Sequence, residues 1–134
     1  MRKKFVLDSS VFLIYASYNK LYRLLDAVKT YGLWIYVNDE LLDEIHRNCP
    51  FVIKVKGITT EQIVEAVKKL SERVNTIPVF KNSPDPKDNF LFDLALQTGS
   101  EVIVSQEKAL LTFAESPVAI HDLKWFKETY PVAL

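Results

Sequence analysis

The chain has 134 residues, of which about half are hydrophobic, so we expect a single domain over residues 1–134 with a sizeable core. Its 17 basic and 17 acidic residues cancel, which argues against attachment to nucleic acid by bulk charge alone. One cysteine excludes an internal disulfide. No apolar stretch matches a signal peptide or the roughly 20 residues of a membrane span, so we expect a cytoplasmic protein with no membrane contact.

Strand and helix signals alternate through the first half of the chain. Residues 5–7 form an apolar strand, followed by helical spacing over 10–18, capped by Ser9 or Ser10, and over 21–31. A second apolar strand over 33–37 leads to a helix that Asn38 caps and that ends before Pro50. Thr59 and Gln62 have the spacing of a capping box, which predicts another helix there.

The second half repeats this alternation. Residues 74–80 read as a strand, and Pro78 within it favours an edge position. The expected elements that follow are a turn over 83–88, a helix over 89–98, a strand over 101–105, a short helix over 107–113, a strand over 118–120 and a helix over 121–130. This order predicts an α/β fold: a parallel sheet of about five strands covered on both faces, with the strands' carboxyl ends at one edge.

Acidic residues recur near that edge. Asp8 directly follows the first strand, and Glu107 follows the strand over 101–105. Glu40 and Glu44 share a face of the helix after the second strand, and Asp88 heads the helix over 89–98. Converging carboxylates repel one another, and Mg²⁺ or Mn²⁺ relieves that repulsion. The set therefore points to metal-dependent hydrolysis of phosphodiester bonds.

Several of these acids also have a purely structural interpretation, whereas Asp8 is the hardest to explain in that way. Asp88 could serve only as a helix cap, and Glu40 and Glu107, taken singly, resemble ordinary surface acids. Asp93 lies about 140° round the helix from Asp88, and a structural role is favoured for it. The case for a site depends on the whole set.

These residues resemble the PIN domain family over nearly the whole chain. The matching segments are Val6-Leu7-Asp8-Ser9-Ser10, the helix over 38–45 and the helix start over 88–95. The run Asp85-Pro86-Lys87-Asp88-Asn89 is the most specific, and it is similar to toxin components of bacterial and archaeal toxin–antitoxin pairs. The family's fourth motif, Thr-Gly-Asp-Lys-Asp-Leu-Leu, stands here as Ser-Gln-Glu-Lys-Ala-Leu-Leu over 105–111.

The resemblance implies a Rossmann-like α/β/α sandwich with a metal-dependent ribonuclease site, often in a dimer, blocked by a cognate antitoxin. It implies that Asp8, Asp88 and Glu107 hold one or two Mg²⁺ or Mn²⁺ ions and that Glu44 completes the catalytic set. Asp93 and Ser10 are secondary candidates. Gln106 replaces the family's glycine, Glu107 its first aspartate, and Ala109 its second.

Positive side chains must bring RNA to such an acidic site. Lys81, Lys87, Lys108 and Lys20 are candidates, although each is more often simply solvated. Tyr15, Tyr18 and Tyr22 could stack on bases, but packing or a dimer surface is favoured.

Other α/β classes fit less well. The three glycines form neither a dinucleotide-binding nor a P-loop motif, so we expect no nucleotide cofactor. A receiver domain would need a further acidic pair, and a haloacid-dehalogenase-like phosphatase would need an aspartate where Ser10 stands. Two alternatives stay open: a PIN-like module that binds RNA or a partner without cutting, and a nuclease of RNA processing.

Overall fold

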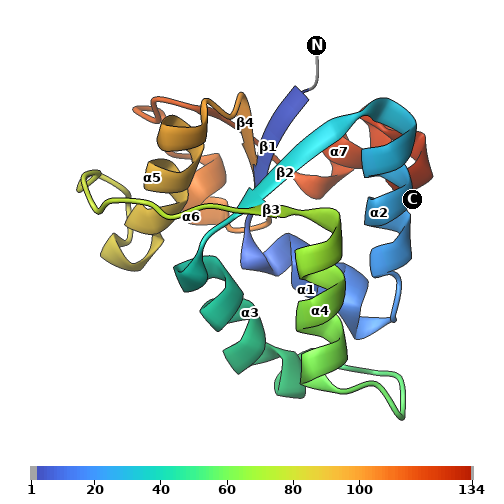
Figure 1. Ribbon diagram of the computed structural model, residues 1–134. Coiled ribbons are helices and arrows are strands. Elements are labelled where there is room, and N and C mark those ends of the chain that lie inside the picture. Colours follow the sequence, from blue (N-terminus) through green and yellow to red (C-terminus); the bar gives the residue numbers. More distant parts are fainter. Residues whose placement is uncertain (1–2, 134) are drawn as a thin grey trace.

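A five-stranded parallel sheet forms the centre of the computed structural model, which describes residues 3–133 (Figure 1). The strand order is β3-β2-β1-β4-β5, and every neighbouring pair is parallel. The strands are β1 (Lys3–Leu7), β2 (Leu33–Val37), β3 (Glu72–Arg73), β4 (Val102–Val104) and β5 (Ala119–His121). The predicted α/β class with a parallel sheet is confirmed.

Helices lie on both sides of this sheet. In Figure 1, α5 lies on one side of β1 and β2, and α2 and α7 lie on the other. Within residues 3–133 no helix has the length and apolar character needed to cross a membrane. The α-helices are α1 (Ser9–Ser17), α2 (Leu21–Tyr31), α3 (Asp39–Val52), α4 (Thr60–Leu70), α5 (Asn89–Thr98), α6 (Lys108–Leu111) and α7 (Leu123–Thr129), and the 3₁₀-helices are η1 (Pro86–Asp88) and η2 (Pro131–Ala133).

Several helix ends follow directly from local sequence. The Asn38 side chain accepts the Leu41 N–H at 3.0 Å and so caps α3. Thr59 and Gln62 form the predicted capping box at the start of α4. Gly32 ends α2 with a φ of 65°, a backbone conformation that is costly for a residue with a side chain.

Two expected helix ends were wrong. Asp8, rather than Ser9 or Ser10, caps α1 through the Ser9 N–H. Helix α3 continues past Pro50 to Val52, because a proline removes only its own N–H and the Cys49 carbonyl still accepts the Ile53 N–H at 3.2 Å.

The strand expected over residues 74–80 was also wrong, because only Glu72–Arg73 pairs with β2. Side chains of α5 bind the backbone of the later residues in place of a neighbouring strand. Gln97 accepts the Ile77 N–H at 2.9 Å and donates to the Ile77 carbonyl at 2.7 Å. Asp93 Oδ1 accepts two further N–H groups, from Val79 at 3.1 Å and Phe80 at 2.8 Å.

Strand β1 lies in the core and leads directly to the candidate site. Phe5, Val6 and Leu7 are buried, and the Phe5 ring meets Phe126 and Tyr130 edge-on. The N–H of the next residue, Asp8, still donates to the Val104 carbonyl at 2.8 Å. Strand packing therefore fixes the backbone of Asp8.

Candidate active site

Asp8 is fully buried and accepts three hydrogen bonds. Its Oδ1 accepts the Ser9 N–H at 2.8 Å, and its Oδ2 accepts the hydroxyls of Ser10 at 3.0 Å and Ser105 at 2.8 Å. Burial raises the pKa of Asp8, and these donors oppose that rise. Because all three partners are donors, these hydrogen bonds favour the ionised form of the carboxylate.

The loop after β4 holds both hydroxyls in their donating orientation. The Ser10 Oγ accepts the Gln106 N–H at 3.2 Å, and the Ser105 Oγ accepts the Glu107 N–H at 3.0 Å. Since backbone donors occupy the acceptor side of each hydroxyl, each proton is directed to Asp8. Gln106 also accepts the Leu123 N–H at 2.8 Å through its side chain, which ties this loop to α7.

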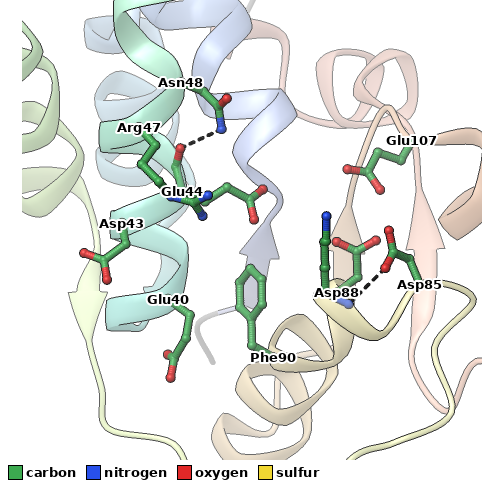
Figure 2. A pocket seen from close by; sticks show the side chains of 10 residues that line it. Glu40, Asp43, Glu44, Arg47, Asn48, Asp85, Asp88, Phe90 and Glu107 are labelled. Carbon is green, nitrogen blue, oxygen red and sulfur yellow. Dashed lines mark hydrogen bonds between the residues drawn. The ribbon is translucent and has the colours of Figure 1, made fainter.

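Three further carboxylates lie near Asp8 across a cleft of about 670 Å³. Figure 2 shows Glu44 extending from α3 toward the gap, with Asp88 and Glu107 on the opposite side. The Ser9 hydroxyl donates to Glu44 and so holds it beside the Asp8 loop. Six acidic and two basic side chains are among the lining residues: Glu40, Asp43, Glu44, Asp85, Asp88 and Glu107, with Arg47 and Lys87.

Asp88 is not merely a helix cap. It occupies the cap position of α5, yet its side chain makes no capping hydrogen bond. Asp85 does the local capping instead, because its carboxylate accepts the Lys87 N–H at 3.0 Å at the start of η1. The Asp88 carboxyl is therefore available to the cleft, where it hydrogen-bonds Glu107.

The carboxyl groups of Asp88 and Glu107 are both harder to ionise than usual. Burial is the largest cause for each; the charges of Asp8 and Glu44 add to it. The pKa of Asp88 rises to about 6 and that of Glu107 to about 8. Their mutual hydrogen bond lowers the pKa of Asp88 and raises that of Glu107, so the pair retains a proton near neutral pH.

The remaining predicted residues lie in different places. Glu40 is exposed on the cleft wall, and Lys87 lines the same cleft. Lys81 lines an adjoining hollow, whereas Lys20 and Lys108 line neither cavity. Asp93 lies outside the cleft lining but lines the same adjoining hollow, and its Oδ1 accepts the N–H groups of residues 79 and 80, which supports the structural interpretation.

Ser9, Ser105, Arg47 and Phe90 belong to this region but were not among the predicted site residues. Ser105 could have been found, because it follows β4 as Asp8 follows β1 and the two strands are neighbours. Arg47 lies one turn after Glu44 on α3. Nothing in the local sequence distinguishes Phe90 from the buried aromatic residues around it.

The donor chemistry fits a hard divalent cation, but the side chains are not arranged as ligands. Carboxylate oxygens are what Mg²⁺ and Mn²⁺ prefer. Within residues 3–133, however, no three His, Cys, Asp or Glu side chains form a group that could hold a metal ion. Asp8 and Glu44 are engaged by serine donors, and Asp88 and Glu107 by each other. An ion would have to displace the proton that the latter pair holds.

The fold is a parallel α/β sheet with an acidic cleft at its carboxyl edge. The family model of the PIN domain matches residues 4–109, so the chain belongs to the PIN domain family. A crystal structure, that of PAE2754 from Pyrobaculum aerophilum, superposes with a TM-score of 0.64 at 14% identity and covers 98% of each chain. That similarity supports the fold alone. A search of curated proteins finds no match to this chain.

Proposed function

We propose that this protein is a divalent-metal-dependent endoribonuclease that hydrolyses phosphodiester bonds of RNA. The observation that carries the proposal is the buried Asp8 carboxylate beside the proton-sharing pair of Asp88 and Glu107. Such crowding of like charges is costly in a free protein, and a cation would relieve it. PIN domains are generally nucleases, which agrees with the family match.

The proposed roles divide between metal binding and water activation. Asp8, Asp88 and Glu107 would hold Mg²⁺ or Mn²⁺, directly or through water. An ion bound there supplies a water of lowered pKa and neutralises charge on the phosphate. Glu44, held by the Ser9 hydroxyl, would orient the attacking water and accept its proton. Arg47 and Lys87 would attract the RNA backbone into the cleft.

We further propose that this protein is a cytoplasmic toxin of a toxin–antitoxin pair. The basis is the sequence run over residues 85–89. An antitoxin that inhibits it would present a basic side chain to the acidic cleft. Induced expression in a bacterial host should arrest growth, and Asp8→Asn should remove the arrest. If cells continue to grow with the wild type as they do with Asp8→Asn, at equal levels of the two proteins, a role in RNA processing would be favoured.

The decisive test is cleavage of a mixed single-stranded RNA with Mg²⁺ or Mn²⁺. Asp8→Asn should lower the rate at least about 100-fold, because transition-state charge stabilisation by a bound ion is worth several kcal/mol. EDTA should abolish cleavage. Asp26→Asn, the same exchange on the exposed face of α2, is the matched control and should cut like the wild type. Equal cleavage by wild type and Asp8→Asn would refute the proposal.

One observation favours a second candidate, a module that binds RNA without cutting it. The four carboxylates are engaged by serines or by each other, and Glu107 is one methylene longer than the family's aspartate. Manganese titration separates the two candidates. A nuclease should bind Mn²⁺ in a way that Asp8→Asn abolishes, whereas a binding module should show no difference between the two proteins.

A further inference from the structure

We propose that the Phe90 ring is a stacking platform for an unpaired base of single-stranded RNA beside the carboxylate cleft. This inference rests on the proposed function, because it takes RNA to be the molecule that enters the cleft. It adds a subsite that lies outside the acidic set and selects unpaired strands.

The first observation is the position of Phe90 between two cavities. Phe90 lines the carboxylate cleft, and it also lines an adjoining hollow of about 370 Å³. Figure 2 shows its ring standing in the gap between Glu40 and Asp88. The residues that line the second hollow with it include Thr76, Pro78, Phe80, Lys81 and Asn89. A strand that passes from the cleft into this hollow therefore passes beside the Phe90 ring and Glu40, which line both cavities.

The second observation is that the Phe90 ring, although it packs against the core, is left partly exposed. The neighbouring Phe92 is fully buried and stacks on Phe80 with ring centroids 4.5 Å apart. Phe90 is only partly buried, and in the part of the chain that the structure describes it takes no part in a ring pair. An apolar ring beside an acidic cleft has no aromatic partner there, and a nucleobase would supply one.

The third observation is the placement of positive charge on either side of the ring. Lys87 lines the carboxylate cleft and Lys81 lines the second hollow, and both side chains are exposed. Phosphates before and after a stacked base can each meet one lysine, while Glu40, which lines both cavities, repels them from its own wall. A ring can reach a base face only where the base is unstacked, so the occupant is a single strand.

Binding of a labelled eight-nucleotide RNA tests the subsite. The full chain is used in calcium buffer, which fills oxygen-ligated sites, and fluorescence anisotropy reports the affinity. Phe90→Ala and Phe90→Leu should weaken binding roughly 5- to 150-fold, the usual effect of losing one base–aromatic stack, and Phe90→Trp should retain it. Tyr31→Ala, which removes an exposed ring at the end of α2, outside both cavity linings, is the control and should bind like the wild type.

Abasic residues placed at each position of the same RNA identify the stacked base. At one position, the abasic substitution should weaken binding to the wild type. The same substitution should not weaken binding to Phe90→Ala any further, since the two changes remove the same contact. A folded Phe90→Leu protein that binds like the wild type, or an abasic scan without such a position, would overturn the subsite.

Cleavage of the same RNA with Mn²⁺ is measured separately, so that the two proposals can fail independently. Coupling between Phe90 and one base without any cleavage would support the subsite and count against the nuclease. Cleavage with no effect of Phe90 on binding would support the nuclease and overturn the subsite.

Discussion

At the scale of single residues, the site contains two opposite solutions to buried negative charge. Asp8 meets only donors, whereas Asp88 and Glu107 meet each other. The first arrangement favours an ionised carboxylate and the second favours a shared proton. Of these carboxyls, Asp8 is therefore the one whose hydrogen bonds favour the charge that a cation would neutralise.

Ser105→Ala tests the donor network around Asp8. The variant removes a buried donor from Asp8 and the acceptor of the Glu107 N–H, so it should lower the free energy of unfolding by roughly 1–3 kcal/mol. Urea unfolding measures this. Ser71→Ala loses one hydrogen bond at the end of α4 and is the matched control, with a smaller expected cost. Equal costs in the two variants would contradict the network.

Glu107→Gln tests the shared proton. The pKa of Glu107 is raised from 4.5 to about 8, so above pH 4.5 the unfolded chain releases a proton that the native protein still holds. The stability contributed by this group is complete below that pH and is lost as the pH rises through about 8. Without divalent ions, the wild type should therefore lose stability from pH 5 to 8.

Guanidinium unfolding between pH 5 and 9 checks this slope. Glu107→Gln should flatten it, and Glu115→Gln, the same exchange at an exposed position, should not. Mg²⁺ or Mn²⁺ should also flatten the wild-type slope, because a bound cation displaces the proton. A slope that is unchanged in Glu107→Gln would mean that the proton resides elsewhere.

At the scale of elements, residues 77–80 depend on side chains of α5 instead of on the sheet. Asp93→Ala frees the N–H groups of Val79 and Phe80 and should cost about 1.5–3 kcal/mol of unfolding free energy, as expected for hydrogen bonds to a charged group. Asp93→Asn keeps the accepting oxygen, so it should be less destabilised and should cleave RNA like the wild type. Loss of cleavage in a stable Asp93→Asn protein would make Asp93 catalytic.

What the sequence could predict follows from the range of the interactions involved. Helix ends at Asn38, Thr59 and Gly32 depend on neighbours within four residues, so the caps were predictable. The loss of strand pairing over 74–80 depends on Asp93 and Gln97, which lie 13 to 20 residues away and whose reach no local pattern encodes. The periodicity of the sequence carries no information about long-range contacts of this kind.

The candidate site shows the same division. Parallel topology alone was enough to expect Asp8 and Glu107 at one edge, and the structure brings Glu44 and Asp88 near them. The role of Ser105 required the pairing of β4 with β1, and that of Phe90 required the positions of two cavities. Neither relation can be read from the spacing of residues along the sequence.

At the scale of the whole molecule, the balance of 17 positive and 17 negative residues makes RNA binding a local matter. Among the described residues that line the cleft and its adjoining hollow, the cations are Arg47, Lys87 and Lys81. Three phosphate contacts with single-stranded RNA predict that log Kobs falls with log salt with a slope of about −2. Lys81→Gln should reduce the slope by roughly 0.7, and Lys124→Gln, at an exposed position outside both cavity linings, should not. A much steeper slope would mean that other basic residues bind the RNA.

The short edge strand has a consequence for the behaviour of the protein at high concentration. A long free strand edge recruits other chains and seeds aggregation. Here β3 spans two residues, and the polar backbone groups just beyond it are occupied by Gln97 and Asp93. Ile77 and Val79 are exposed on this segment, so Gln97 and Asp93 keep an apolar stretch from becoming a pairing template. They therefore contribute to the colloidal stability of the protein as well as to its fold.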